Sequence, residues 1–239
     1  MDSPAELLDD IRALKTRAKN RRDGKEFHGA LELLARAADL AEQGRADAWD
    51  DEAAPFVAEL ADIHGMMGGV TRREGLEAPG TANRHDLLMQ SIGHYDRGFA
   101  YETSVRGEAT SYNLVNRIVG RILVDPASLD ADPDAEPSSV PAMLRAAHDS
   151  VLTQLELRRD DPWMLADRAL LEILMSESTS ARRAYGPLLR TAPPAYVYTS
   201  VLDTLEPLAD IAGDRRPALR DAVEDLRRDH DRLAAQPKP

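Results

Sequence analysis

The chain has 239 residues, of which 43% are hydrophobic and 5% aromatic, so it can bury a large core made mostly of aliphatic side chains. Its net charge of -12 argues against a general affinity for nucleic acid or an anionic membrane, because an acidic surface releases no counterions from either. The absence of cysteine excludes disulfides, thiolate zinc sites and cysteine nucleophiles.

The first predicted helical hairpin covers residues 4–44. Ser3, Pro4 and Glu6 have the spacing of an N-cap, a first-turn proline and the glutamate of a capping box. Apolar residues follow at helical spacing, and after a short polar turn a second such set continues to Gly44, a typical helix C-cap. The sequence therefore begins with two antiparallel helices.

The same pattern of helix, turn and helix recurs along the rest of the chain. A second hairpin is predicted at about 51–103, with its two helices at about 51–73 and 86–102. A helix at about 108–124 is followed by an acidic, proline-rich segment that cannot continue it. The remaining hairpins are predicted at about 108–158, 161–190 and 195–233.

Ten helical segments without any alternating strand pattern predict an all-α fold. Gly186 and Pro187 are expected to interrupt one of the later helices. Because consecutive hairpins can stack and share a core, we expect residues 1–239 to form a single helical-repeat domain. The expected architecture is a solenoid built from stacked antiparallel hairpins.

The second hairpin contains residues at the spacing of a tetratricopeptide repeat. Small side chains at these positions allow two helices to approach closely, while a larger one fills the space beside them. Thr71 stands where the repeat has an aromatic residue, and the turn is about ten residues longer than in that repeat. The matching residues are Met67, Gly68, Thr71 and Gly75 in the first helix, and Ser91, Tyr95 and Gly98 in the second. This resemblance implies a tetratricopeptide-like, right-handed solenoid built from degenerate hairpins.

A longer part of the chain, approximately Asp51 to Ala212, resembles a known family. The resemblance rests on YDRGFAYE, SYNLVNRIV and the following DP, and on DDPWMLADRALLEIL and APPAYVYTSVLDTLEPLA. These segments are similar to the tetratricopeptide-type region related to the TRAF-binding domain of apoptosis signal-regulating kinases, and to bacterial regulatory modules of that pattern. The resemblance implies a helical scaffold that binds protein without chemistry. The kinase domain is absent from this sequence, so its signalling role does not transfer.

Several segments invite a catalytic or ligand-binding interpretation. GMMGG, at 65–69, lies within a helical pattern and lacks the Gly-Lys-Ser/Thr ending of a phosphate loop. The acidic segment 125–136 lacks EF-hand spacing, although a weak calcium site there stays open. Four further residues of two predicted helices could be metal ligands: His64, His94, Asp96 and Glu102. Neither helix has the Glu-x-x-His pair of a helical metal site, so we interpret the histidines as surface or helix-end residues. We expect no metal, no cofactor and no catalytic site.

Four aromatic residues lie outside the repeat signature. Core or hairpin packing is a more common role for such side chains than a ligand cage. We therefore expect Trp49, Trp163, Tyr196 and Tyr198 to pack within the fold.

A polar stripe interrupts the predicted helix at about 108–124. Its members are Asn113, Asn116, Arg117 and Arg121, which with Gly120 fall within an arc of about 140°. Asn donates and accepts hydrogen bonds, and Arg can form two hydrogen bonds to one carboxylate. These four residues can therefore form a peptide clamp, a row of side chains that binds a partner peptide. Arg72 and Arg73 would extend it. The alternatives are an ordinary solvated face, or a stripe that bonds neighbouring helices within the fold.

The function expected from the sequence is that of a protein-binding adaptor or regulatory scaffold. Its partner would be another protein, such as an effector protein or one with an acidic segment. The sequence also allows a homo-oligomer. We expect no nucleic-acid partner, because the net charge is -12, and no membrane partner, because no signal peptide or apolar run of roughly 20 residues is present. The expected location is cytoplasmic. One alternative is a sensor that binds a small anionic ligand such as a nucleotide. Another is a metal-dependent helical hydrolase.

Overall fold

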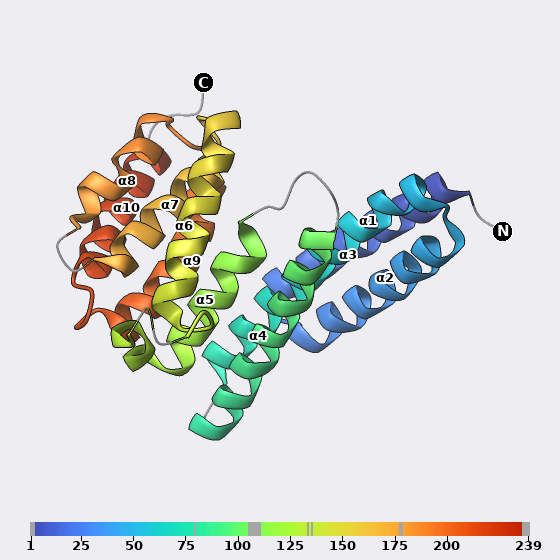
Figure 1. The fold of residues 1–239 in the computed structure, drawn as a ribbon, viewed down its shortest axis with the longest axis horizontal. Helices are drawn as coiled ribbons and strands as arrows, with labels where there is room; N and C mark the ends of the chain where they lie inside the picture. Colours follow the sequence, from blue (N-terminus) through green and yellow to red (C-terminus); the bar gives the residue numbers. More distant parts are fainter. Residues whose placement is uncertain are drawn as a thin grey trace. The chain divides into compact units, whose positions relative to one another are not determined.

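The computed structural model describes residues 3–78, 80–104, 111–132, 134, 136–176 and 179–235. All regular secondary structure in these residues is helical, which confirms the predicted all-α class (Figure 1). The ten α-helices and one 3-10 helix are α1 Pro4–Asp23, α2 Phe27–Asp47, α3 Asp50–Glu77, α4 Thr81–Ser104, α5 Tyr112–Val124, η1 Pro126–Asp130, α6 Val140–Leu157, α7 Pro162–Met175, α8 Ala181–Arg190, α9 Ala195–Ala212 and α10 Ala218–Ala234.

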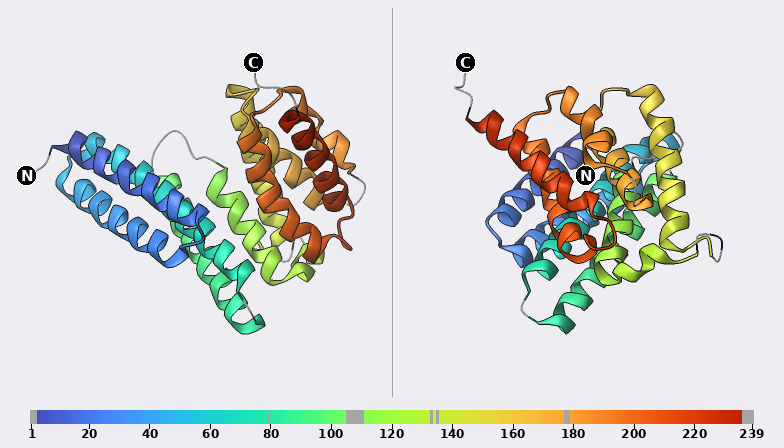
Figure 2. Two further views of the ribbon diagram at one scale, coloured as in Figure 1. Left: turned by 180° about the vertical axis from the view of Figure 1, so that it is seen from behind. Right: turned by 90° about the vertical axis from the view of Figure 1, so that its left-hand side faces the viewer.

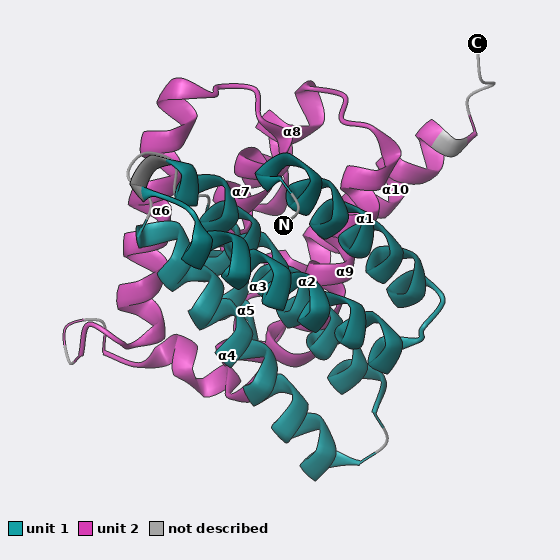
Figure 3. Ribbon diagram, turned by 90° about the vertical axis from the view of Figure 1, so that its right-hand side faces the viewer, with its two compact units in different colours: residues 1–120 teal, residues 121–239 magenta. Residues whose placement is uncertain are grey.

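The helices belong to two compact units, residues 1–120 and 121–239, which are coloured separately in Figure 3. Unit 1 contains α1 to α4 and most of α5, and unit 2 contains the end of α5 and all later helices. The arrangement of all five predicted hairpins as one solenoid, in a single domain, stays a prediction.

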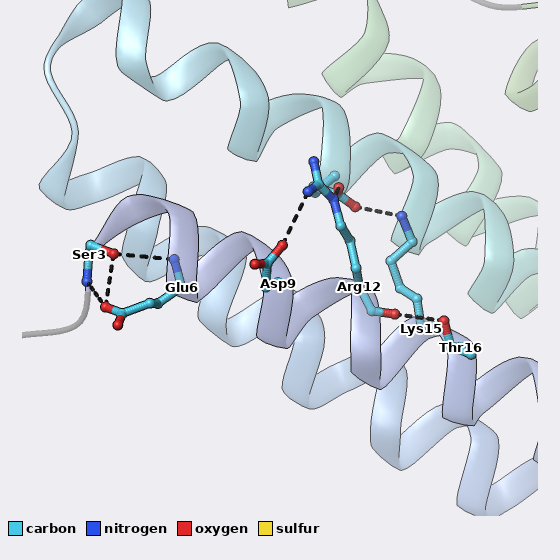
Figure 4. Close-up of polar contacts among 7 residues, drawn as sticks. Ser3, Glu6, Asp9, Arg12, Lys15 and Thr16 are labelled. Atoms are coloured by element: carbon cyan, nitrogen blue, oxygen red, sulfur yellow. Dashed lines mark hydrogen bonds and ion pairs between the residues drawn. The ribbon is translucent and has the colours of Figure 1, made fainter.

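Helix α1 begins with the capping box that the sequence predicts. The Glu6 amide donates to Ser3 Oγ over 3.3 Å, and the Ser3 amide donates to Glu6 Oε2 over 2.8 Å (Figure 4). Further along α1, the Lys15 ammonium forms ion pairs with Glu59 and Asp62 of α3. Burial alone would lower the pKa of Lys15, but these two carboxylates raise it above its ordinary value. Lys15 therefore stays charged and links α1 to α3.

The first three helices share one apolar core. Helices α1 and α2 run side by side as the predicted hairpin, as the two views in Figure 2 show. The buried core residues that they share with α3 are Ile11, Leu14, Ala18, Ala30, Leu34, Ala37, Ala41, Phe56, Leu60, Ile63 and Val70.

Helices α3 and α4 approach closely at the residues of the repeat signature. A Cβ atom at Gly68 would lie 2.9 Å from ring atoms of Tyr95, so only glycine leaves room for this ring. Beside it, Ser91 Oγ donates to the Gly68 carbonyl oxygen over 2.8 Å. The predicted close approach of the two helices at small residues is therefore observed, and the segment 65–69 is helical.

Unit 2 is also built from packed antiparallel helices. Helix α6 packs on α7, α7 on α8, and α9 on α10, which also contacts α8. The side chains of Ser139, Asp161 and Ser180 accept hydrogen bonds from the first amides of α6, α7 and α8. These caps fix where the three helices begin.

A buried arginine holds three segments of unit 2 together. Arg216 Nε donates to the Leu174 carbonyl oxygen over 2.8 Å, at the end of α7. Its Nη2 donates to the Leu129 carbonyl oxygen over 3.4 Å, in η1, and its Nη1 donates to the Arg215 carbonyl oxygen over 2.8 Å. One guanidinium group thus satisfies carbonyl groups at element ends that lack intrahelical partners.

Some predicted helix ends differ from the observed ones. Helix α3 continues to Glu77 and α4 already begins at Thr81, so the loop between them is shorter than predicted. Helix α8 runs through Pro187, which the sequence was expected to break. Its buried neighbours Tyr185 and Leu188 hold the segment helical although the proline donates no backbone hydrogen bond. Residues 108–110 of the predicted helix at 108–124 lie outside the described residues.

Candidate functional site

Asn113, the first member of the polar stripe, lies in the interior of unit 1. It has no exposed surface, and its Nδ2 donates to the Ala61 carbonyl oxygen over 3.2 Å and to Glu102 Oε1 over 3.0 Å. A Cβ atom at Gly65 would lie 2.7 Å from Oδ1 of Asn113, and one at Gly98 would lie 2.6 Å from it. The amide therefore sits in a space that glycines of α3 and α4 leave open, and it bonds both helices.

Asn116 and Arg72 form a second internal contact between α5 and α3. Arg72 Nη1 donates to Asn116 Oδ1 over 2.8 Å, and both side chains are buried. Asn116 Nδ2 donates to the Tyr112 carbonyl oxygen over 2.8 Å, one turn earlier in α5. Each polar group of the Asn116 amide thus has a partner within the unit, as a buried amide requires.

The remaining arginines of the predicted clamp also have internal partners. Arg117 Nε lies 2.5 Å from Asp96 Oδ1 of α4, and Arg73 Nη1 lies 3.7 Å from Asp23 Oδ1 of α1. In unit 2, Arg121 Nη1 donates to the Ser138 carbonyl oxygen over 3.2 Å. These three side chains are half-buried.

The polar stripe is therefore used to attach helices to one another. This agrees with the alternative in which the stripe bonds neighbouring helices, because Asn113, Asn116 and Arg72 are buried and bonded across helices. A partner-binding role for the six residues stays a prediction. The sequence could not separate the two roles, since inward-facing and groove-facing amides have the same helical spacing.

A stack of three rings lies between α3 and α4 of unit 1. The ring centroids of His64 and His94 are 6.0 Å apart, and those of His64 and Tyr101 are 5.6 Å apart with an interplanar angle of 7°. The Tyr101 hydroxyl donates to Glu42 Oε1 of α2, and this hydrogen bond lowers the pKa of Glu42. His64 and His94 are thus half-buried and stacked, which corrects the interpretation of both as surface or helix-end residues.

Burial keeps both imidazoles neutral near pH 7. It lowers the pKa of His64, and together with the neighbouring His64 and Arg97 it lowers the pKa of His94 to about 4. Among the described residues, the structure contains no group of three or more His, Asp or Glu side chains that could hold a metal ion.

Unit 2 contains an open pocket of about 380 Å³, lined by Asp130, Asp214, Arg215 and Pro217. Arg215 forms an ion pair with Asp130, and Arg220 Nη2 lies 2.6 Å from Asp214 Oδ1. The charges that border this pocket are therefore matched in pairs, and nothing about it favours an anion over a cation.

Three of the four aromatic residues expected to pack within the fold are exposed. Trp49 is 84% exposed, Trp163 43% and Tyr196 65%, whereas Tyr198 is buried as expected. Trp163 and Tyr196 are the second residues of α7 and α9, and their ring centroids are 6.2 Å apart. The prediction was wrong because the buried face of these first turns carries the next residues, Met164 and Val197, and because Trp49 lies in the turn before α3. The Pro residues that precede Trp163 and Tyr196 were the signal for this placement.

None of the helices in the described part of the chain combines the length and the apolar character that a membrane crossing requires. Comparison with known proteins gives no match: no family model, no curated protein and no solved structure is similar to this chain.

Proposed function

We propose that this chain is a non-catalytic, protein-binding scaffold that contacts its partner through the exposed aromatic pair of unit 2. The pair consists of Trp163 and Tyr196, and its exposure is the observation that carries the proposal. The resemblance to tetratricopeptide-type regulatory regions supports a binding role. The proposal includes a tetratricopeptide-like stacking of the hairpins, with α7 and α9 presenting these two rings.

The two rings form a ready contact surface. Their centroids lie 6.2 Å apart with the planes tilted by 41°, a separation at which aromatic rings attract each other. The backbone beneath Trp163 is fixed, because Asp161 Oδ1 accepts from the Trp163 amide over 2.9 Å and from the Met164 amide over 3.3 Å. Side chains that are ordered before binding lose little entropy on association, and Trp and Tyr contribute most to protein interfaces.

The connection that precedes α7 contributes further exposed residues to the proposed contact surface. Leu157 is the last residue of α6, only six positions before Trp163, and it is 86% exposed. Arg158 and Arg159 follow it in the exposed connection to α7. Arg159, which is exposed in this connection, can contact a carboxylate of an acidic segment of the partner.

The test is to capture partners with the full chain from its native cell and then to measure one purified partner by calorimetry. We expect Trp163→Ala with Tyr196→Ala to weaken binding at least about tenfold, with an unchanged thermal midpoint. Met175→Ala is the matched control, since Met175 is an exposed apolar residue at the opposite end of α7. Equal affinity of the double variant and the control would refute the aromatic pair as the contact surface.

A further inference from the structure

Trp49 occupies the turn between α2 and α3 in unit 1. The two helices are joined by only Ala48 and Trp49, both with extended backbone, and Trp49 is the N-cap residue of α3. Its carbonyl oxygen accepts from the Glu52 amide over 2.7 Å, which anchors the turn to the first turn of α3. A largely exposed indole is thus held on a short, well-anchored connection.

The hairpin does not need Trp49 for its core. A Cβ atom at Gly44 would lie 2.3 Å from the ring of Phe56, so this ring packs directly on the backbone of α2. Phe56 is buried and belongs to the core that α1, α2 and α3 share. The ring of Phe56 therefore already fills the space between α2 and α3 near the turn, and the indole of Trp49 lies outside this space.

The sequence around Trp49 is strongly acidic. Asp47 and Glu52 are exposed on either side of it, and Asp50 and Asp51 follow it directly in the chain. The nearest cation in the sequence, Arg45, lies 2.7 Å from Glu42 in the preceding turn of α2. An exposed indole is therefore flanked in the sequence by four acidic residues, and among the described residues Asp47 and Glu52 form no ion pair.

We propose that Trp49 and its flanking carboxylates dock a segment of a protein partner in which apolar side chains alternate with Lys or Arg. Contact of the apolar side chains with the indole removes a large apolar surface from water, and tryptophan is among the residues that contribute most to interfaces. The basic groups gain from the carboxylates and from the face of the indole ring. Charge complementarity thus selects a basic partner, and it disfavours an anionic membrane surface.

This surface is independent of the aromatic pair in unit 2. It lies in the other compact unit, and it is built from different residues. Either proposal can fail without the other, because each is tested with its own residues and its own ligand.

The experiment uses the full chain and a labelled peptide of alternating leucine and arginine as the basic probe. Binding is measured by fluorescence anisotropy. In a chain with Trp163→Phe, Trp49 is the only tryptophan, so its emission reports burial directly. We expect a blue shift of this emission on binding, an affinity that weakens with salt, and a loss of at least about tenfold in Trp49→Ala with unchanged melting.

A charge-matched pair of variants controls for the acidity of the whole chain. Asp47→Asn with Glu52→Gln should weaken binding, whereas Asp10→Asn with Asp39→Asn should not, although both remove two exposed carboxylates from unit 1. Equal weakening by the two pairs would mean non-specific attraction and would overturn the proposal. Full binding by Trp49→Ala, equal binding of a leucine–glutamate peptide, or a blue shift with phosphatidylserine vesicles in place of the peptide would overturn it as well.

Discussion

Asn113 of α5 donates from one side-chain nitrogen to both Ala61 of α3 and Glu102 of α4. We expect Asn113→Ala to lower the free energy of unfolding of unit 1 by about 2 kcal/mol, because it removes two buried hydrogen bonds and leaves the glycine-lined space empty. Urea denaturation measures the loss. Asn83→Ala is the control, since Asn83 is exposed in the first turn of α4, and it should change stability by less than about 0.5 kcal/mol. Equal effects of the two variants would contradict the role of Asn113.

Two helical glycines of unit 1 should respond oppositely to alanine. At Gly68 the new methyl group would meet the Tyr95 ring at 2.9 Å, and overpacking of this kind costs about 1–3 kcal/mol. At Gly93, within α4, no heavy atom of the described residues outside the adjoining stretch of this helix lies within 4 Å of the added carbon, so alanine should stabilise the helix by about 0.5–1 kcal/mol. Thermal melting of both variants compares them. A stabilised Gly68→Ala would show that α3 and α4 are farther apart than described.

Acid should destabilise unit 1 through the stacked histidines. The folded-state pKa of His94 is about 4, below its ordinary value, so the unfolded chain binds more protons as the pH falls from about 6.5. Stability is therefore full above about pH 6.5, and it declines until the pH reaches about 4. Because the ring is partly exposed, we expect the loss to be about 1 kcal/mol.

The comparison of wild type with His94→Gln isolates this contribution. Urea midpoints measured between pH 7 and pH 4 should fall less steeply in the variant, because glutamine has no proton to gain. Identical slopes for the two chains would exclude His94 as the group responsible.

The half-buried arginines of the stripe offer a fourth stability test. Arg117→Glu with Arg121→Glu places a carboxylate against Asp96 and removes the bond to the Ser138 carbonyl oxygen. We expect a lower thermal midpoint, equivalent to about 1–3 kcal/mol, rather than the normal melting that a solvated face would give. Adding Asp96→Arg should restore part of the loss by reversing the pair. An unchanged midpoint in the double variant would mean that these arginines do not stabilise the fold and could line a partner-binding groove.

The sequence predicted the fold class better than the use of individual residues. Capping signals and helical spacing placed α1 and α2 almost correctly, because those signals are local. Pro187 was misleading, since the burial of Tyr185 and Leu188 is a tertiary effect that a local rule does not include. The polar stripe was recognised, but its inward orientation depends on Gly65 and Gly98, which are distant in the sequence. The exposure of Trp49 and Trp163 could not be predicted for the same reason, because other side chains fill the core and this is a tertiary effect.

The buried guanidinium of Arg216 also has a consequence for biosynthesis. It bonds the Leu129 carbonyl oxygen, 87 residues earlier in the chain, and the Leu174 carbonyl oxygen, 42 residues earlier. A ribosome makes the protein from its N-terminus, so η1 and the end of α7 must wait for residue 216 before they gain this donor. Unit 1 can fold while translation continues, whereas unit 2 gains the hydrogen bonds of Arg216 only shortly before its last helix is made. In a nascent chain arrested before residue 216, unit 1 should therefore resist protease, whereas the segment around η1 should be cleaved.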